Sequence, residues 1–521
     1  LVMTVTAVLG LGLALRALRP GASSLECAPH REVRLPIRLP RPLSRVPGIA
    51  WGCALVAFLN AACWSEVSPP LQTPDEPAHF AYVQELAEAH RLPTHGTTYS
   101  PEEEVALADL HHNAVQFVPG AATISSRAQQ RKLQHDLRAG YARVGPADAG
   151  TAASEPPTYY ALEAIPYELG SGGTLLARLQ LMRLLSALFG GLTALFAYLF
   201  VREALPGAPW AWAVGGLGVA FAPALGYMSG AVNPDAMLFA VSAALFYLLA
   251  RAYRRGLTVR LATAIGATMA LGSLTKLNFY GLIPGALAAL VVLAIRRRPT
   301  SRRAAHVALA VTCAVAVCPT LAYTALASPV SHPPLSELSS AAATATHQGS
   351  TLEEISYSWQ LFLPRLPGMT NYFPGISTWR QLWFDGLVGL YGWADTQFPV
   401  WVYELALIAA ALIGLLCARE LIRTRTTLVR RAGELATYAL MAAGVMALVG
   451  AASYGAGAPH GPPFWEPRYL LPMLPLFGAL LALAARGAGR RWGPAAGMLL
   501  VVLVLSHDIF SQLLVVSRYY H

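Results

Sequence analysis

Two adjacent acidic residues, Asp75 and Glu76, stand between prolines in the stretch TPDEPAHFAYVQEL (residues 73–86). A positioned carboxylate can act as a general base, and paired carboxylates can also hold a metal ion or a hydroxyl-rich substrate. One acid would be explained by helix capping alone. Two adjacent acids beside a membrane segment favour a functional role.

The residues after this pair predict a helix, because apolar residues recur at spacings of three and four. Pro77 suits the first helical position, and the residue before a proline avoids helical angles, so Glu76 is expected as the N-cap. The alternative has Thr73 as the cap and Glu76 as its capping-box partner. Either arrangement places both carboxylates at the positive end of the helix dipole.

His79 follows the pair closely and could join a metal site. A single histidine at this spacing favours a structural hydrogen bond instead. A second motif, EPPTYYAL (155–162), contains Glu155 and Tyr159; it predicts either a helix start with interfacial aromatics or a substrate contact. Asp235, in VNPDAM (232–237), is expected to cap a helix.

Two cations lie apart from the basic loops of this chain: Lys276 in SLTKLNFYG and Arg468 in FWEPRYLLPMLP. At the level of lipid headgroups a positive side chain can hold a lipid phosphate. The alternative for each is an anchor whose charged end reaches the membrane surface.

The composition shows what must position these residues. The chain has 521 residues, of which 55% are hydrophobic and 13% charged, whereas soluble domains carry about 25% charged residues. The net charge of +10 comes from arginines clustered between apolar runs, which is the pattern of cytoplasmic loops. This distribution argues against nucleic-acid binding and predicts an all-α polytopic membrane protein.

A spanning helix needs about 20 apolar residues. Twelve runs meet this need, near 1–18, 48–64, 178–200, 208–229, 234–250, 259–275, 277–296, 303–327, 399–418, 433–453, 468–485 and 493–515. With twelve spans, every arginine cluster falls on one side, which we assign to the cytoplasm. Cleavage of the first run as a signal peptide would place the arginines of 31–45 outside, so we expect it to be retained.

Two long segments then face the outside, near 65–177 and 328–398. The first is large and carries both acidic motifs. The second contains TWRQLWFDGLVGLYGWADTQFPVW (378–401), whose aromatic residues favour an interfacial helix over a lipid-facing cavity.

The order of these motifs resembles the GT-C superfamily of integral-membrane glycosyltransferases. PDEPAHFAYVQEL is similar to the Asp-Glu motif of protein mannosyltransferases, and EPPTYYAL to the HPPLYY-type motif of aminoarabinose and mannosyl transferases, with Glu155 in place of histidine. VNPDAM, SLTKLNF, the stretch from FLPRLPG to FPVW, and PRYLLPMLP resemble a bacterial GT-C-like family of unknown function. The likeness spans about 48–485.

The resemblance implies a GT-C-like bundle of about 12 helices in a bacterial cytoplasmic membrane. It divides the chain into an N-terminal run with a basic cytoplasmic segment (1–47), a GT-C-like domain (48–485), and a last helix with a short outer tail (486–521). It further implies inverting transfer of a sugar from a polyprenyl-phosphate donor to a glycan, lipid or protein acceptor outside the cytoplasm, in cell-envelope glycan synthesis.

The reaction needs one base for the acceptor hydroxyl and cations for the departing phosphate. We cast Asp75 as the base, with Glu76 orienting the acceptor or a metal. Lys276 and Arg468 would hold the donor phosphate, and Glu155 and Tyr159 would line the acceptor side. A divalent cation near the acidic pair is left open, and no other cofactor is expected.

Two other classes stay open. A lipid-sugar flippase or polymer transporter would carry charged residues along a pathway inside the membrane; the charges here lie mostly at the ends of the apolar runs. An O-antigen-type polymerase or ligase would rest on arginines outside the membrane, for which Arg365 and Arg380 are candidates.

Overall fold

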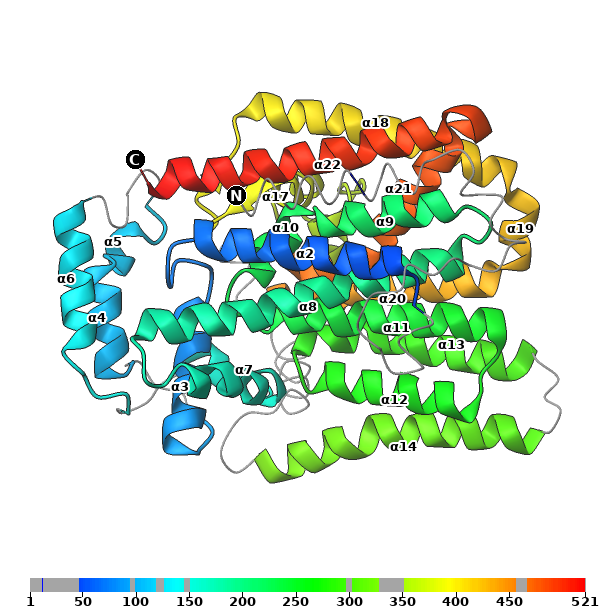
Figure 1. Cartoon of the computed structure of the whole chain (residues 1–521). Helices are drawn as coiled ribbons and strands as arrows, with labels where there is room; N and C mark the ends of the chain where they lie inside the picture. The colour runs from blue at the N-terminus through cyan, green and yellow to red at the C-terminus, as the bar shows by residue number, and fades with distance from the viewer. Residues whose placement is uncertain are drawn as a thin grey trace.

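The computed structural model describes residues 12, 46–93, 99–118, 126–144, 150–296, 302–327, 351–455 and 466–520. The first apolar run, apart from residue 12, and the arginine cluster of 31–45 lie outside these residues, as does 328–350 of the second long segment. Within the described part the chain forms a bundle of long apolar helices with a group of short helices at one end (Figure 1).

Nine helices in the described part are long and apolar enough to cross a membrane. They are α2 (Gly48–Val67), α8 (Leu175–Ala204), α11 (Asp235–Arg255), η3 with α13 (Leu277–Leu282, Ile283–Arg296), α14 (Arg302–Ala327), α18 (Val400–Arg423), α20 (Ala432–Gly455), η5 with α21 (Pro467–Met473, Leu474–Gly487) and α22 (Gly489–Tyr519). The helical membrane architecture predicted from the apolar runs is therefore confirmed.

The predicted count of twelve spans is not confirmed. The run at 208–229 is a helix pair, α9 (Pro209–Ala220) and α10 (Pro223–Ser229), bent by 52° and able to serve as a tenth span. Pro223 at the start of α10 explains the break, since proline cannot continue the hydrogen-bond ladder of α9. The run at 259–275 forms α12 (Val259–Ser273), whose 15 residues measure about 22 Å, less than the hydrocarbon core.

The longest central helix, α8, packs against α2 and α11 and extends from one end of the bundle to the other. At its C-terminal end, Arg255 pairs with Glu203 at 3.1 Å and Arg431 donates a hydrogen bond to the Ala204 carbonyl. Two arginine clusters that are distant in sequence therefore meet here, as the topology prediction requires. Its N-terminal end meets the acidic motif through Arg183.

The short helices lie at the N-terminal end of α8, on the opposite end of the bundle from α19 (Arg425–Arg430) (Figure 1). They are α3 (Glu76–Ala89), α4 (Pro101–Asp109), α5 (His112–Val115), α6 (Arg127–Arg138), η2 (Gly150–Ser154) and α7 (Thr158–Leu169). We call this end the site end.

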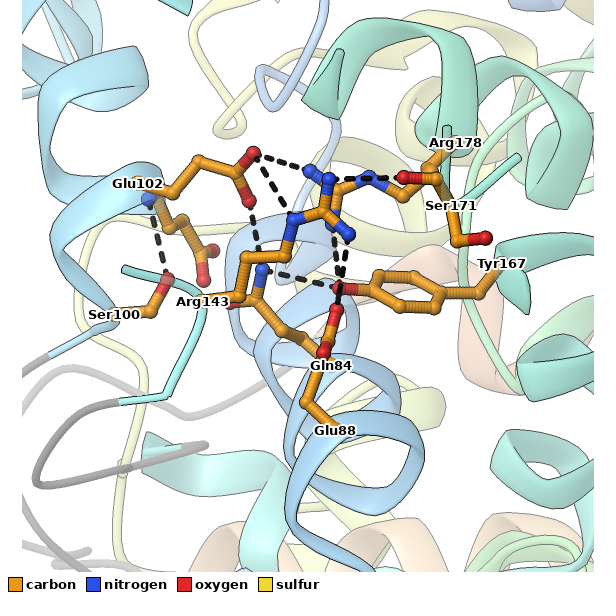
Figure 2. A network of polar contacts seen from close by, with 9 residues as sticks. Gln84, Glu88, Ser100, Glu102, Arg143, Tyr167, Ser171 and Arg178 are labelled. Carbon is orange, nitrogen blue, oxygen red and sulfur yellow. Dashed lines mark hydrogen bonds and ion pairs between the residues drawn. The ribbon is translucent and has the colours of Figure 1, made fainter. Parts of the chain in front are cut away.

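A buried polar network fastens the short helices to α8 (Figure 2). Arg178, at the N-terminal end of α8, pairs with Glu102 of α4 and donates to the Tyr167 hydroxyl of α7. Gln84 of α3 donates to Glu102 at 2.9 Å, and the Tyr167 hydroxyl donates to Glu88 at 2.9 Å. One arginine thus fixes three helices, which holds α3 rigidly against the bundle.

The second long segment also contributes to the site end. It contains α16 (Thr351–Phe362), a π-helix η4 (Thr378–Phe384), α17 (Asp385–Gly389), and two short antiparallel strands, β1 (Leu390–Tyr391) and β2 (Thr396–Gln397), with Leu390 opposite Gln397. Of the interfacial helix expected over 378–401, 378–389 is helical, and the expectation is wrong for the hairpin that follows. The two positive-φ residues Gly392 (φ 60°) and Ala394 (φ 59°) turn the chain into the hairpin instead.

Candidate active site

The acidic pair separates at the start of α3. Asp75 is the N-cap in the left-handed conformation (φ 63°, ψ 0°), and Glu76 is the first helical residue. The expected cap at Glu76 is therefore wrong by one position, and the capping-box alternative also fails, because no side chain caps this helix. A non-glycine residue at positive φ is uncommon and costs free energy, which marks Asp75 as a candidate functional residue.

Glu76 is fully buried and held by four donors. Arg183 binds it through both oxygens, at 2.7 and 2.6 Å, and the backbone amides of Leu71 and Val232 donate at 2.9 and 3.0 Å. Arg183 also donates to the carbonyls of Ser65, Ser68 and Pro69. With both carboxylate oxygens committed, Glu76 joins α3, α8 and the segment before α11, and it does not face a substrate.

Asp75 has the opposite environment. Its side chain is 34% exposed and pairs with Arg468 of η5. Burial would raise the pKa of Asp75, but the charge of Arg468, supported by Lys276, lowers it to about 2. At neutral pH Asp75 is therefore an accessible carboxylate with a cation beside it.

Asp235 lies at the centre of a group of charged side chains, and only 1% of its own side chain is exposed. We call this group the charged cluster; its members are Asp75, Glu155, Asp235, Lys276, Glu466 and Arg468. Lys276 contacts it at 2.9 Å and Arg468 approaches it at 3.5 Å. The capping role expected for Asp235 is wrong, because its carboxylate makes no cap hydrogen bond to α11 and instead binds these two cations. The position of Asp235 after Asn-Pro in the sequence does not indicate these ion pairs, because Lys276 and Arg468 come from distant segments of the chain.

Both predicted cations thus meet in one place, and each is nearly buried. Lys276 also lies 3.8 Å from Glu155, and Arg468 pairs with Glu466. Burial opposes the charge on Lys276, but Asp235 and Glu155 outweigh it and raise the pKa of the ammonium group. Glu466 was missed in the sequence, where it appeared only as the residue before Pro467 in an aromatic segment.

A close contact between two glycines, Gly281 and Gly444, helps to fix Lys276 in this cluster. The carbonyl oxygen of Gly281 in η3 would lie 2.1 Å from a Cβ atom at Gly444 in α20, so only glycine permits this approach. The tight contact fixes η3, whose N-cap is Lys276.

The other predicted residues lie behind the cluster. His79 is buried, and its Nδ1 lies 2.9 Å from the Tyr160 hydroxyl. Burial, with Lys276 adding to it, lowers the pKa of His79 to about 3, so its imidazole is neutral at physiological pH. The Tyr160 ring stacks on Tyr82, whose hydroxyl donates to the Glu155 carbonyl at 3.2 Å. These contacts hold the EPPTYY motif beside α3.

Tyr159 is fully buried, and its hydroxyl lies 2.7 Å from the hydroxyl of Ser186 in α8, which donates to Glu163. The structure therefore brings together Asp75, Lys276, Arg468 and Glu155, whereas Tyr159 and Glu76 are turned into the protein.

A metal ion does not fit these residues well. Glu76 has both oxygens engaged by Arg183 and amides, so it cannot converge with Asp75 on a cation. Within the described residues, the structure shows no group of three or more His, Cys, Asp or Glu side chains arranged to hold a metal.

A pocket opens beside Arg468. Its lining is mostly apolar or aromatic and comes from α10, α17, β1 and the start of η5, with Arg468 and Glu466 as its charged members. We call it the Arg468 pocket. The pocket is small, about 50 Å³, well below the roughly 300–1,000 Å³ of small-molecule sites.

The chain belongs to a membrane family of unknown function: the family described as "Predicted membrane protein (DUF2142)" matches residues 58–477. This confirms the resemblance to a membrane family of unknown function. A comparison with curated proteins gave no match.

Two solved structures are similar: ArnT from Cupriavidus metallidurans bound to undecaprenyl phosphate, and the same protein in the apo state. Each is 16% identical, and the match covers 83% of this chain and 59% of that chain, with TM-scores of 0.40 and 0.41. The chain therefore spans less than two thirds of the length of these proteins, and the likeness is too distant to carry a functional argument.

Proposed function

We propose that this protein is an inverting glycosyltransferase that takes its sugar from a polyprenyl-phosphate donor. One observation carries the proposal: Asp75, an accessible carboxylate at positive φ, pairs with the buried cation Arg468, and the buried cation Lys276 joins the same cluster through Asp235. The carboxylate supplies a base and the cations supply a phosphate site.

The reaction requires one bond to form and one to break. The acceptor hydroxyl oxygen forms a bond to the anomeric carbon while Asp75 takes its proton. The bond from the anomeric carbon to the phosphate oxygen breaks, and its electron pair leaves with the polyprenyl phosphate. The leaving phosphate needs no proton, because Lys276 and Arg468 stabilise its negative charge. Attack from the face opposite the leaving group inverts the anomeric centre.

The resting ion pairs keep the base inactive until the donor binds. Two cations are shared among four carboxylates: Asp75, Glu155, Asp235 and Glu466. A donor phosphate that binds Arg468 can displace either of its two partly exposed partners, Asp75 (34% exposed) and Glu466 (33% exposed), and in this proposal it displaces Asp75. Without that cation, and beside a new anion, the pKa of Asp75 rises from its resting value of about 2. Donor binding thus makes Asp75 a stronger base.

In this proposal the prenyl chain lies past the apolar residues around the Arg468 pocket, because the pocket itself, of about 50 Å³, is too small for isoprene units. We assign the site end to the outer side of a bacterial cytoplasmic membrane, because arginine clusters gather at the opposite end of α8. Sugar nucleotides stay in the cytoplasm, so an outward-facing transferase needs a lipid-linked donor.

In this proposal Glu155 borders the acceptor side through its contact with Lys276. His79 and Tyr159 support the site from behind, and Glu76 holds the start of α3 in place. The sugar and the acceptor class, whether glycan, lipid or protein, are left open by this cluster. A divalent cation is not required by this mechanism.

The transporter alternative predicts acids inside the membrane. Asp508 in α22 is such a residue, but its two oxygens accept hydrogen bonds from Trp64 and Gln512, at 3.0 and 3.1 Å. This arrangement ties α22 to α2, as polar side chains do between membrane helices. Arg380, a candidate for the polymerase alternative, is engaged by Asp385 and Glu404. Neither arrangement is as suited to a substrate as the charged cluster.

The two lysines of the chain allow a matched test of the phosphate site. Lys276→Gln removes a buried cation, and loss of a charged hydrogen bond worth about 1.5–3 kcal/mol should weaken undecaprenyl-phosphate binding roughly tenfold to hundredfold. Lys132→Gln, on the surface of α6, should leave binding unchanged. The affinities can be measured in detergent micelles by native mass spectrometry. Equal affinities of the two variants would remove Lys276 from the donor site.

A further inference from the structure

A second pocket, of about 400 Å³, lies in the second long segment, and Asp75 is not among its lining residues. Its volume is within the range of small-molecule sites. We call it the Trp379 pocket. Leu363, Pro364, Gly375 and Ile376 form part of the lining, and its polar and aromatic residues are Gln360, Arg365, Asn371, Phe373, Ser377, Thr378 and Trp379.

The walls of this pocket are fixed by hydrogen bonds at the C-terminal end of α16. The Thr378 hydroxyl donates to the Gln360 carbonyl at 2.5 Å, and the Trp383 indole donates to the Leu361 carbonyl at 2.7 Å. The Gln360 amide donates to the Thr370 carbonyl at 2.7 Å. The loop between α16 and η4 is therefore held in one shape, and the pocket is preformed.

The pocket has a cation and an aromatic face available to a ligand. Within the described residues no carboxylate lies within ion-pair distance of Arg365, whose guanidinium makes a single long hydrogen bond of 3.5 Å to the Met369 carbonyl. Trp379 is 43% exposed and stands in the first turn of the π-helix η4. Short π-helical segments are frequent at functional sites.

These side chains match an anionic sugar. A guanidinium binds carboxylate or phosphate in a bidentate manner, and a tryptophan face covers the apolar side of a pyranose ring. Asn371 and Ser377 are further polar residues of the lining that can contact sugar hydroxyls. Leu363 and Ile376 add apolar surface to the lining, but an acyl chain has no group that would pair with the Arg365 guanidinium, so the lining favours an anionic ligand over an uncharged lipid tail.

The pocket is connected to the charged cluster through a small aromatic core. Phe373, which lines the pocket, belongs to a buried cluster with Leu361 and Trp383. Tyr469 and Leu470, the residues after Arg468, pack against that same cluster. The segment after η4 then approaches η5, where a Cβ on Gly386 would lie 2.4 Å from Pro467. The pocket therefore flanks the proposed donor site.

We propose that the Trp379 pocket binds a hexose unit carrying an anionic group, as part of the acceptor glycan. The acceptor assignment rests on the proposed glycosyltransferase function, whereas the saccharide binding itself does not. The ligand class is a sugar with a phosphate or carboxylate substituent. Arg365 sets the requirement for the anion, and Trp379 sets the requirement for the ring.

Binding of glucose 6-phosphate, glucuronate, glucose and inorganic phosphate to the full-length protein in nanodiscs tests this proposal, with saturation-transfer NMR as the readout. At least one of the two anionic sugars should bind saturably, and more tightly than glucose or phosphate alone. Whether glucose 6-phosphate or glucuronate binds distinguishes the two anions. Arg365→Gln and Trp379→Ala should each weaken binding at least tenfold.

Arg138→Gln and Trp401→Ala serve as controls, since both residues are exposed and lie outside the pocket, and these variants should bind as the parent does. Undetectable binding of both anionic sugars, or binding unaffected by both pocket variants, would overturn the proposal. Binding of inorganic phosphate as tight as that of the sugars would overturn the saccharide assignment.

Undecaprenyl-phosphate binding, measured on the same preparations, separates this proposal from the proposed function. Arg365→Gln and Trp379→Ala should leave the lipid affinity unchanged, while Lys276→Gln lowers it. If the two pocket variants lose sugar binding but keep lipid binding, the acceptor assignment is supported. Sugar binding without any Lys276-dependent lipid binding would overturn the acceptor assignment, because the transferase on which it rests would have failed.

Discussion

Asp75→Asn should reduce sugar transfer by about 10² to 10⁴-fold, the contribution of a positioned general base. The amide preserves the shape of the side chain but cannot take the proton of the acceptor hydroxyl. Folding should be retained, since the side chain is 34% exposed. Transfer is measured as release of labelled sugar from a panel of polyprenyl-phosphate sugars into membrane-derived acceptors.

The same variant should bind undecaprenyl phosphate at least as tightly as the parent. Asp75 competes with the donor phosphate for Arg468, and the amide removes that competing charge. Asp136→Asn, on the exposed helix α6, is the matched control and should keep full activity. Full transfer by Asp75→Asn would exclude Asp75 as the base; loss of lipid binding would mean that its charge supports the donor site instead.

Glu76→Gln should destabilise the protein by about 3–5 kcal/mol, because it leaves the Arg183 guanidinium buried without its carboxylate. The expected result is a much lower unfolding temperature, or loss of folded protein, measured by intrinsic tryptophan fluorescence during heating. The two adjacent acids would then differ in what their substitution removes: sugar transfer at Asp75 and stability of the fold at Glu76.

A double-variant cycle provides the control for this pair. Removing Arg183 as well, in Glu76→Gln with Arg183→Met, should cost less than the sum of the two single changes, because the two side chains stabilise each other. A Glu76→Gln protein that unfolds at the parent temperature yet fails to transfer sugar would contradict the structural role and return Glu76 to the catalytic machinery.

Much of the fold could be predicted from apolar periodicity and charge. Length and hydrophobicity place eleven of the twelve predicted runs in helices of the described chain, and the positive-inside pattern predicts which loops share an end. The failures occur where local rules compete with tertiary contacts. The stretch 378–401 is rich in aromatics, but two positive-φ residues near its middle fold it into a hairpin.

Part of the site could be predicted because its two cations have unusual positions in the sequence. Lys276 and Arg468 stand out in the sequence because they are cations at the edge of apolar runs away from arginine clusters. Asp235, Glu466 and Arg183 resemble ordinary capping or headgroup residues, and only their partners from distant helices distinguish them. The separate environments of Asp75 and Glu76 likewise arise from tertiary contacts that no spacing rule encodes.

The position of a bound undecaprenyl phosphate tests the central claim most directly, by cryo-electron microscopy of the protein in nanodiscs. We predict that the phosphate lies within hydrogen-bond distance of both Lys276 and Arg468, with Asp75 displaced from Arg468. A phosphate bound elsewhere, with the Asp75–Arg468 pair intact, would contradict the account.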